Sequence, residues 1–347
     1  MSLVDVASPP VSYTTQSIPP YAFDASLLAD PDATRGRVEL ALDLRHAGKR
    51  DLSIAWEAVG AIDAPVVFVA GGISATRHAI ASAAFPDAGW WQAQAGVLDP
   101  QRVRIIAIDW LGADGSLDAP IDSADQSDAV AAVLDALGID TLEAFVGCSY
   151  GAMVGLQFAA RYPSRLRQLV AISGCHRPHP YASAWRALQR KVVALGQLQC
   201  DETHGLSLAR QLAMLSYRTP EEFGERFDTG VLIEGGLARC AAEDYLDACG
   251  SRFVEHFSAT AYLRLSESID LHRVDTRQIS VPTTVVTVAE DRLIPVEDAY
   301  ALIEHIRADT QLRVLRSRYG HDAFLKENEA IAAVLQEALA DVCGGSA

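Results

Sequence analysis

The fold is decided by residues 144–163, which read AFVGCSYGAMVGLQFAARYP. A short apolar run ends at Gly147, and an alanine-rich stretch with the composition of a helix follows Gly151. The G-x-S-x-G pattern between them is typical of a sharp strand-to-helix turn that holds its central residue, Ser149, in a strained backbone conformation. Such a turn presents the hydroxyl at the carboxyl edge of a sheet, beside a helix N-terminus. We therefore predict a nucleophile at Ser149; the alternative is a turn of the same composition without chemistry.

Other short apolar runs lie on both sides of this segment. They are rich in β-branched residues and fit strands buried on both faces of a parallel sheet. These runs occupy residues 65–70, 103–108, 169–172, 284–288 and 312–315. Helical patterns alternate with them, and this alternation predicts an α/β fold with a doubly wound, mostly parallel sheet flanked by helices. Alternating stretches at 37–46 and 51–60 predict two further strands joined by a turn at residues 47–51.

The remaining segments define the domain organisation. Residues 1–36 hold five of the 15 prolines among small polar residues, a composition typical of an arm rather than a core. Residues 175–270 break the strand–helix alternation and contain mostly helical patterns, so we predict a helical cap inserted into the core. The α/β core is then formed by residues 37–174 and 271–347.

The composition excludes several classes of function. Among 347 residues, 29 Lys and Arg stand against 45 Asp and Glu, a formal net charge of −16. Such an acidic chain lacks the basic surface that nucleic acid or an anionic membrane requires. Its start shows no secretory signal, and its six dispersed cysteines show no metal-ligand spacing. We expect a cytoplasmic, reduced protein that acts on small molecules with no metal and no bound cofactor.

Two later segments supply the partners that a serine nucleophile needs, a general base and a carboxylate that orients it. In α/β-hydrolases the acid follows the serine in the chain and the histidine comes last. Asp291 follows the predicted strand at 284–288 and His321 follows the one at 312–315. Glu290 is the alternative carboxylate. Eight other histidines are alternative bases, for which we expect surface or structural positions: His46, His78, His176, His179, His204, His256, His272 and His305.

An acyl-transfer site also needs two donors for the oxyanion. The residue after the nucleophile supplies one through its backbone N–H, here Tyr150, and the loop after an early strand supplies the other. Gly71 and Gly72 follow the strand at 65–70 and let the backbone approach a substrate closely, so we assign the second donor to the N–H of Ile73. One such donor is worth about 3 kcal/mol of transition-state stabilisation. The alternative is an ordinary tight turn.

The chain resembles the homoserine O-acyltransferases of the α/β-hydrolase superfamily over about residues 38–335. The resemblance rests on GISA (72–75), GWW (89–91), the Ser149 turn, RQLAMLSYRT (210–219), DRLIP (291–295) and GHDAFL (320–325). Members of that family acylate the hydroxyl of homoserine, or in some cases serine, from acetyl-CoA or succinyl-CoA. The resemblance implies an acyl-serine, ping-pong mechanism, an acyl-CoA co-substrate, a place in methionine biosynthesis and a homodimer.

The resemblance also implies roles for substrate-binding residues. Arg218 would bind the carboxylate of the amino acid, a task that suits a guanidinium. Tyr217 would support Arg218, and Asp322 would hold the amino group or hydroxyl of the acceptor. The phosphates of CoA need local positive charge, for which Arg186, Arg190 and Lys191 are candidates; the alternative is a solvated helix face.

The sequence leaves the donor and the acceptor open. Acetyl and succinyl donors remain alternatives, as do homoserine and serine, the latter in cysteine biosynthesis. A serine esterase or thioesterase with the same three residues is a further alternative. A non-catalytic binding protein of the same fold is disfavoured because serine, acid and histidine are all present in the expected order.

Overall fold

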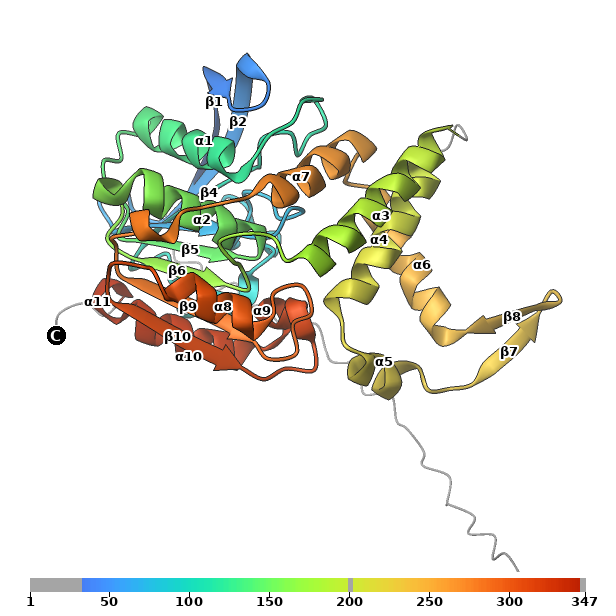
Figure 1. The fold of residues 1–347 in the computed structure, drawn as a ribbon. Coiled ribbons are helices and arrows are strands. Elements are labelled where there is room, and N and C mark those ends of the chain that lie inside the picture. The colour runs from blue at the N-terminus through green and yellow to red at the C-terminus, as the bar shows by residue number, and fades with distance from the viewer. Residues whose placement is uncertain (1–32, 199–201, 344–347) are drawn as a thin grey trace, which may run out of the picture.

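An eight-stranded sheet forms the centre of the computed structural model, which describes residues 33–198 and 202–343 (Figure 1). The order of its strands is β1-β2-β4-β3-β5-β6-β9-β10. Their bounds are β1 Ala33–Leu44, β2 Gly48–Val59, β3 Val66–Ala70, β4 Arg104–Ile108, β5 Ala144–Cys148, β6 Leu169–Ile172, β9 Thr283–Val288 and β10 Thr310–Leu315. From β4 to β10 neighbouring strands are parallel, whereas β1 and β2 pair in antiparallel fashion. The predicted α/β, mostly parallel architecture is confirmed.

Helices cover both faces of the sheet because successive residues of each central strand point to opposite sides. In β3, Phe68 packs into a core shared with Leu134 and Phe158, whereas its neighbour Val67 packs into a second core with Leu335. The first core lies against α1 (Ser123–Ala136), α2 (Tyr150–Arg161) and α8 (Val296–Ile303), and the second against α10 (Asn328–Ala338). Short helices α9 (Ala323–Lys326) and α11 (Ala340–Cys343) and four 3-10 turns complete the layers. The central strands are buried on both faces of the sheet, and for this reason their sequences are continuously apolar.

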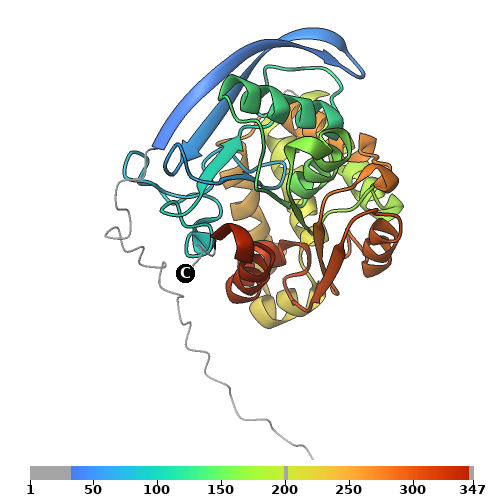
Figure 2. The same ribbon diagram turned by 90° about the vertical axis from the view of Figure 1, so that its left-hand side faces the viewer.

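The first two strands are longer than the sequence predicts. Residues 49–51, predicted as part of a turn, pair with residues 41–43, so the turn is confined to residues 45–47. Their side chains are exposed, and polar residues therefore cost the ladder nothing there. β1 begins at Ala33, so the last four residues of the predicted arm, 33–36, belong to the sheet. The rest of the arm, residues 1–32, lies outside the described residues. Figure 2 shows this long curved pair at one side of the molecule.

The chain between β6 and β9 leaves the sheet, and its described residues contain five α-helices. They are α3 (Pro180–Leu198), α4 (Glu202–Tyr217), α5 (Pro220–Phe227), α6 (Ala241–Val254) and α7 (Ala259–Leu271). Val193, Leu206 and Tyr262 pack into a small core of their own, separate from those of the sheet. A hairpin, β7 (Val231–Glu234) with β8 (Leu237–Cys240), also lies here and was not predicted, because its strands are short and mostly exposed. None of the helices among the described residues is long and apolar enough to cross a membrane.

Candidate active site

Ser149 lies at the tip of a strained turn between β5 and α2. Its backbone adopts φ 55° and ψ −115°, outside the regions that non-glycine residues normally occupy. The flanking glycines make the turn possible. A Cβ on Gly147 would lie 2.3 Å from the carbonyl oxygen of Gly151, and one on Gly151 would lie 2.3 Å from that of Ala70. The sequence pattern therefore reflects backbone packing that only glycine permits.

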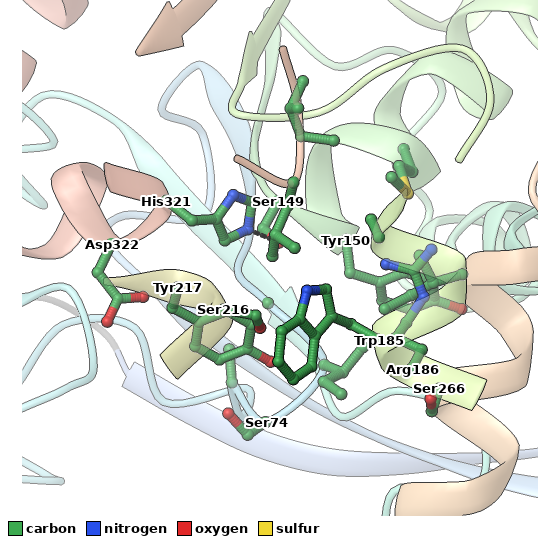
Figure 3. A pocket seen from close by; sticks show the side chains of 18 of the residues that line it. Ser74, Ser149, Tyr150, Trp185, Arg186, Ser216, Tyr217, Ser266, His321 and Asp322 are labelled. Atoms are coloured by element: carbon green, nitrogen blue, oxygen red, sulfur yellow. Dashed lines mark hydrogen bonds between the residues drawn. The ribbon is translucent and has the colours of Figure 1, made fainter. Parts of the chain in front are cut away.

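The structure brings Ser149, His321 and Asp291 together in a hydrogen-bonded series. The serine Oγ lies 2.8 Å from Nε2 of His321, and Nδ1 of the same ring lies 2.7 Å from Oδ2 of Asp291 (Figure 3). The other carboxylate oxygen, Oδ1, accepts hydrogen bonds from the backbone N–H groups of Leu293 and Ile294, at 2.8 and 3.1 Å. These two bonds fix the carboxylate, which in turn fixes the ring and leaves Nε2 facing the hydroxyl.

Glu290, the alternative carboxylate, points away from this series. Its side chain accepts hydrogen bonds from the backbone N–H of Ser317 at 2.8 Å and from the guanidinium of Arg316 at 3.2 Å. Among the histidines that the structure describes, the ring of His321 is the one hydrogen-bonded to Ser149. His78 and His272 instead have partners elsewhere, Glu57 and Ser123.

The position of His321 depends on the residue before it. Gly320 has φ 56°, and a Cβ there would lie 2.7 Å from the backbone oxygen of Tyr217. The same contact brings the Tyr217 ring within 5.7 Å of the imidazole, centroid to centroid. Burial is the largest single influence on the pKa of His321 and lowers it, but the charge and hydrogen bond of Asp291, together with the charge of Asp322, raise it more. The pKa therefore lies above the ordinary histidine value.

The two residues predicted as oxyanion donors, Tyr150 and Ile73, both lie close to the serine in the cavity lining. Tyr150 is the first residue of α2, and its N–H therefore has no acceptor within that helix. Ile73 follows Gly72 in the loop after β3, and this loop is tied to the Ser149 turn by the hydrogen bond from the N–H of Gly151 to the carbonyl oxygen of Gly71, at 2.9 Å. Both residues line the cavity in front of Ser149. Both residues thus lie at the cavity in front of the nucleophile, and their role as oxyanion donors stays a prediction.

A cavity of about 220 Å³ opens in front of Ser149, and we call it the Ser149 cavity. Its wall is mostly apolar and aromatic, with Trp185, Tyr217 and Tyr262 prominent. Its charged lining residues besides His321 are Arg186, Arg210 and Asp322. Figure 3 shows Asp322 and Arg186 on opposite sides of Ser149. A small pocket with cations and an anion around a nucleophile fits a charged, polar substrate rather than a lipid chain.

Arg210 is a cationic lining residue that the sequence patterns did not single out; the predicted carboxylate contact is Arg218. Arg218 is only 8% exposed, lies outside the lining of the Ser149 cavity, and forms ion pairs with Glu222 at 2.7 Å and with Asp322 at 2.8 Å. Arg210 lines the cavity, and among the described residues no carboxylate pairs with it. The signal that identifies it is its spacing: residues seven apart, here 210 and 217, share one helix face, whereas 218 is turned by about 100°.

The three predicted CoA contacts on α3 have different surroundings from one another. Arg186 and Arg190 both bind Asp270 of α7, at 2.6 and 2.7 Å. Arg186 lines the Ser149 cavity, and Lys191 is exposed. Within the described residues, no cluster of His, Cys, Asp and Glu is arranged to hold a metal ion, and Cys148, Cys175, Cys240 and Cys249 are free thiols. The hydrogen-bonded serine, histidine and aspartate offer nucleophilic acyl transfer through a serine.

The comparisons with known proteins agree with the geometry. Residues 65–328 match the family model of the alpha/beta hydrolase fold, so the chain belongs to that family and the predicted fold class is confirmed. Within it, the chain belongs to the homoserine O-acyltransferases, as the sequence resemblance implied. It is 59% identical over 342 residues to a homoserine O-succinyltransferase of Xanthomonas campestris pv. campestris, covering 98% of this chain and 91% of the relative.

More distant relatives include other acyltransferases. A serine O-succinyltransferase of Litchfieldella anticariensis is 31% identical over 318 residues, which cover 78% of this chain and 86% of that protein. Among solved structures, a homoserine O-acetyltransferase from Bacillus anthracis superposes with a TM-score of 0.80 at 15% identity, covering 88% of this chain and 97% of that one. Esterase E22 superposes with the same TM-score at 17% identity, covering 88% and 100%. These structures show the shared fold.

Proposed function

We propose that the protein transfers a succinyl group from succinyl-CoA to the hydroxyl of L-homoserine, through an acyl-enzyme on Ser149. The observation that carries the proposal is the Ser149–His321–Asp291 series, which faces a cavity lined by two arginines and a carboxylate, in a chain 59% identical to a homoserine O-succinyltransferase. An O-acylated homoserine belongs to methionine biosynthesis, and we expect the enzyme to act in the cytoplasm.

The first half-reaction forms the acyl-enzyme. His321 accepts the proton of Ser149, whose Oγ attacks the thioester carbon, and Asp291 stabilises the imidazolium. The N–H groups of Tyr150 and Ile73 donate to the oxyanion, and each is worth about 3 kcal/mol in the transition state. The tetrahedral intermediate then breaks its C–S bond, and the thiolate of CoA leaves with the proton from His321. The serine ester remains in the cavity.

The second half-reaction uses the same groups in reverse. His321 removes the proton of the homoserine hydroxyl, whose oxygen attacks the ester carbon, and returns a proton to Ser149 as it leaves. Arg210, which lines the cavity without a carboxylate partner, binds the α-carboxylate of homoserine. Asp322 binds the ammonium group, and Arg218 acts as a positioning residue that holds this carboxylate through their ion pair at 2.8 Å.

The preference for a succinyl donor follows from a count of charges. The reaction with succinyl-CoA brings two carboxylates into the Ser149 cavity, one on the acyl group and one on homoserine, whereas an acetyl donor brings one. Two arginines line the cavity. Arg186 is held at 2.6 Å by Asp270, a carboxylate that it shares with Arg190, so the three side chains together retain a positive charge. We assign Arg186 to the distal carboxylate of the succinyl group.

Serine as the acceptor is the second candidate, and a specific comparison disfavours it. The strain whose homoserine O-succinyltransferase is 59% identical to this chain also has a serine O-succinyltransferase, to which this chain is 30% identical over 350 residues. The twofold difference in identity supports homoserine. An esterase with the same three residues is the third candidate, and the charged lining of the cavity argues against it.

The decisive experiment is a grid of donors and acceptors. Release of the CoA thiol is followed with succinyl-CoA or acetyl-CoA, each with homoserine, with serine or without an acceptor, and products are identified by mass spectrometry. The proposal predicts O-succinylhomoserine as the main product and a succinylated Ser149 when the acceptor is omitted. Ser149→Ala should yield neither. Turnover that is independent of any acceptor and ends in free succinate would refute transfer in favour of hydrolysis.

We also propose that the enzyme is a homodimer. The hairpin β7–β8 carries exposed apolar side chains at Val231, Leu232, Ile233 and Leu237, and a patch of this kind is typical of a protein interface. Light scattering tests this: the wild type should have twice the mass of the chain, and Ile233→Asp should lower the mass toward that of a monomer.

A further inference from the structure

A second and larger cavity adjoins the Ser149 cavity, and we call it the basic cavity. Its volume is about 640 Å³. It lies between α4 and α6 of the inserted segment on one side and the core loops around Thr76 and Asp109 on the other. Ser74, Ala75 and Arg210 line both cavities. A ligand whose reactive end lies at Ser149 can therefore extend past Ser74 into the basic cavity.

The lining of the basic cavity is unusually positive for this protein. Its cationic residues are Arg210, Arg218, Arg226, Arg252 and Lys326, and its carboxylates are Asp109 and Asp114. Asp109 is bound by Arg77, and Arg218 and Arg226 both bind Glu222. Arg252 and Lys326 have no carboxylate partner among residues 33–198 and 202–343, and both are exposed. They belong to two different elements, α6 and α9.

The positive charge around the basic cavity needs an explanation because the whole chain has a formal net charge of −16. Cations gathered at one cavity repel one another, and a phosphate-bearing ligand relieves that repulsion. Aromatic side chains lie among them: Tyr245, Phe253 and Phe257 line the same cavity, and the guanidinium of Arg226 lies 4.5 Å from the ring centroid of Tyr245. Cations beside aromatic rings suit a nucleotide, whose base stacks while its phosphates pair with guanidinium and ammonium groups.

We infer that the basic cavity binds the phosphorylated nucleotide end of the acyl-CoA donor, with Arg252 and Lys326 as its phosphate contacts. This inference rests on the proposed function and adds a site to it. The pantetheine arm passes Ser74 and Ala75 and carries the thioester to Ser149. The assignment differs from the predicted contacts on α3, because Arg186 and Arg190 share Asp270 and neither lines the basic cavity. The donor thus spans both cavities, and homoserine occupies only the smaller one.

The test compares two donors that differ only in the nucleotide. Steady-state kinetics are measured with succinyl-CoA and with succinyl-pantetheine, which lacks all phosphates, for the wild type, Arg252→Glu and Lys326→Glu. Lys49→Glu is the matched control, since Lys49 is an exposed residue of β2 that lines neither cavity. Each cavity variant should raise the KM for succinyl-CoA about tenfold, as expected for the loss of one charge-assisted contact. The KM for succinyl-pantetheine and for homoserine should stay within about twofold.

A direct measurement accompanies the kinetics. Adenosine 3′,5′-bisphosphate should inhibit competitively with succinyl-CoA, and both cavity variants should weaken this inhibition while Lys49→Glu should not. Equal KM increases with both donors, or unchanged inhibition, would overturn the inference. So would an effect confined to Lys191→Glu, which would place the phosphates on α3. The proposed function fails separately: it is refuted if neither donor acylates Ser149 in the wild type.

Discussion

Substitution of two arginines eight residues apart should affect two different properties, the binding of the acceptor and the stability of the fold. Arg210 lines the Ser149 cavity without a carboxylate partner among the described residues, whereas Arg218 is buried between Glu222 and Asp322. Removal of the first should impair binding of the acceptor, and removal of the second should weaken the fold. Arg210→Met and Arg218→Met test this, since each replaces a guanidinium by an apolar side chain of similar length.

The expected size of each effect follows from the contacts. The Arg210 guanidinium lies 4.9 Å from the centroid of Phe253 and 5.7 Å from that of Tyr217, so it is already oriented before substrate binds. A forked contact from such a group to a carboxylate is worth about 2–3 kcal/mol, and Arg210→Met should raise the KM for homoserine about a hundredfold. Arg218→Met leaves two buried carboxylates without their common partner, which costs about 3–5 kcal/mol.

The assay pairs kinetics with thermal unfolding. Arg210→Met should still release CoA from succinyl-CoA in a single turnover, because the first half-reaction does not involve homoserine, and its Tm should change by less than about 1 °C. Arg218→Met should lower the Tm by about 5 °C. Arg210→Lys is the control that keeps the charge without the fork and should fall between wild type and Met. An unchanged KM for homoserine in Arg210→Met, or a wild-type Tm in Arg218→Met, would refute the reasoning.

Three further outcomes follow from the site. Arg186→Met should lower kcat/KM for succinyl-CoA about tenfold or more and leave acetyl-CoA nearly unaffected; an equal loss with both donors contradicts its assignment. Gly320→Ala should lower kcat, because Cβ would meet Tyr217 and displace His321; wild-type kcat counts against this. The pKa of His321 is raised above the ordinary histidine value, and the neutral ring acts as the base. As the pH decreases, kcat/KM should therefore begin to fall at a pH above that ordinary value. Asp322→Asn should shift this fall in kcat/KM to lower pH. An unchanged pH profile would show that Asp322 does not raise the pKa of His321.

The Ser149 turn and the edge on which its partners lie were predictable from sequence because both depend on local physics. Gly147 and Gly151 are required by backbone contacts within one strand–turn–helix unit, and parallel strands bring their carboxyl ends to one edge. The choice between Asp291 and Glu290 is not decided by local physics, since both follow the same strand. It depends on Leu293 and Ile294, whose N–H groups hold Asp291, and on Ser317, which holds Glu290.

What the sequence by itself determined was the α/β class, the nucleophile and the order of its acid and base, because apolar periodicity and glycine sterics act between near neighbours in the chain. What only the tertiary structure decided was the distribution of charge around the nucleophile. Neighbouring positions on α4 differ by about 100° in direction, and packing of that helix against α3 and α6 directs Arg210 into the cavity and Arg218 toward Glu222. The carboxylates that pair with Arg218 lie on elements that follow α4, and the cavity that Arg210 lines is formed by several segments, so both depend on how the inserted helices pack on the sheet.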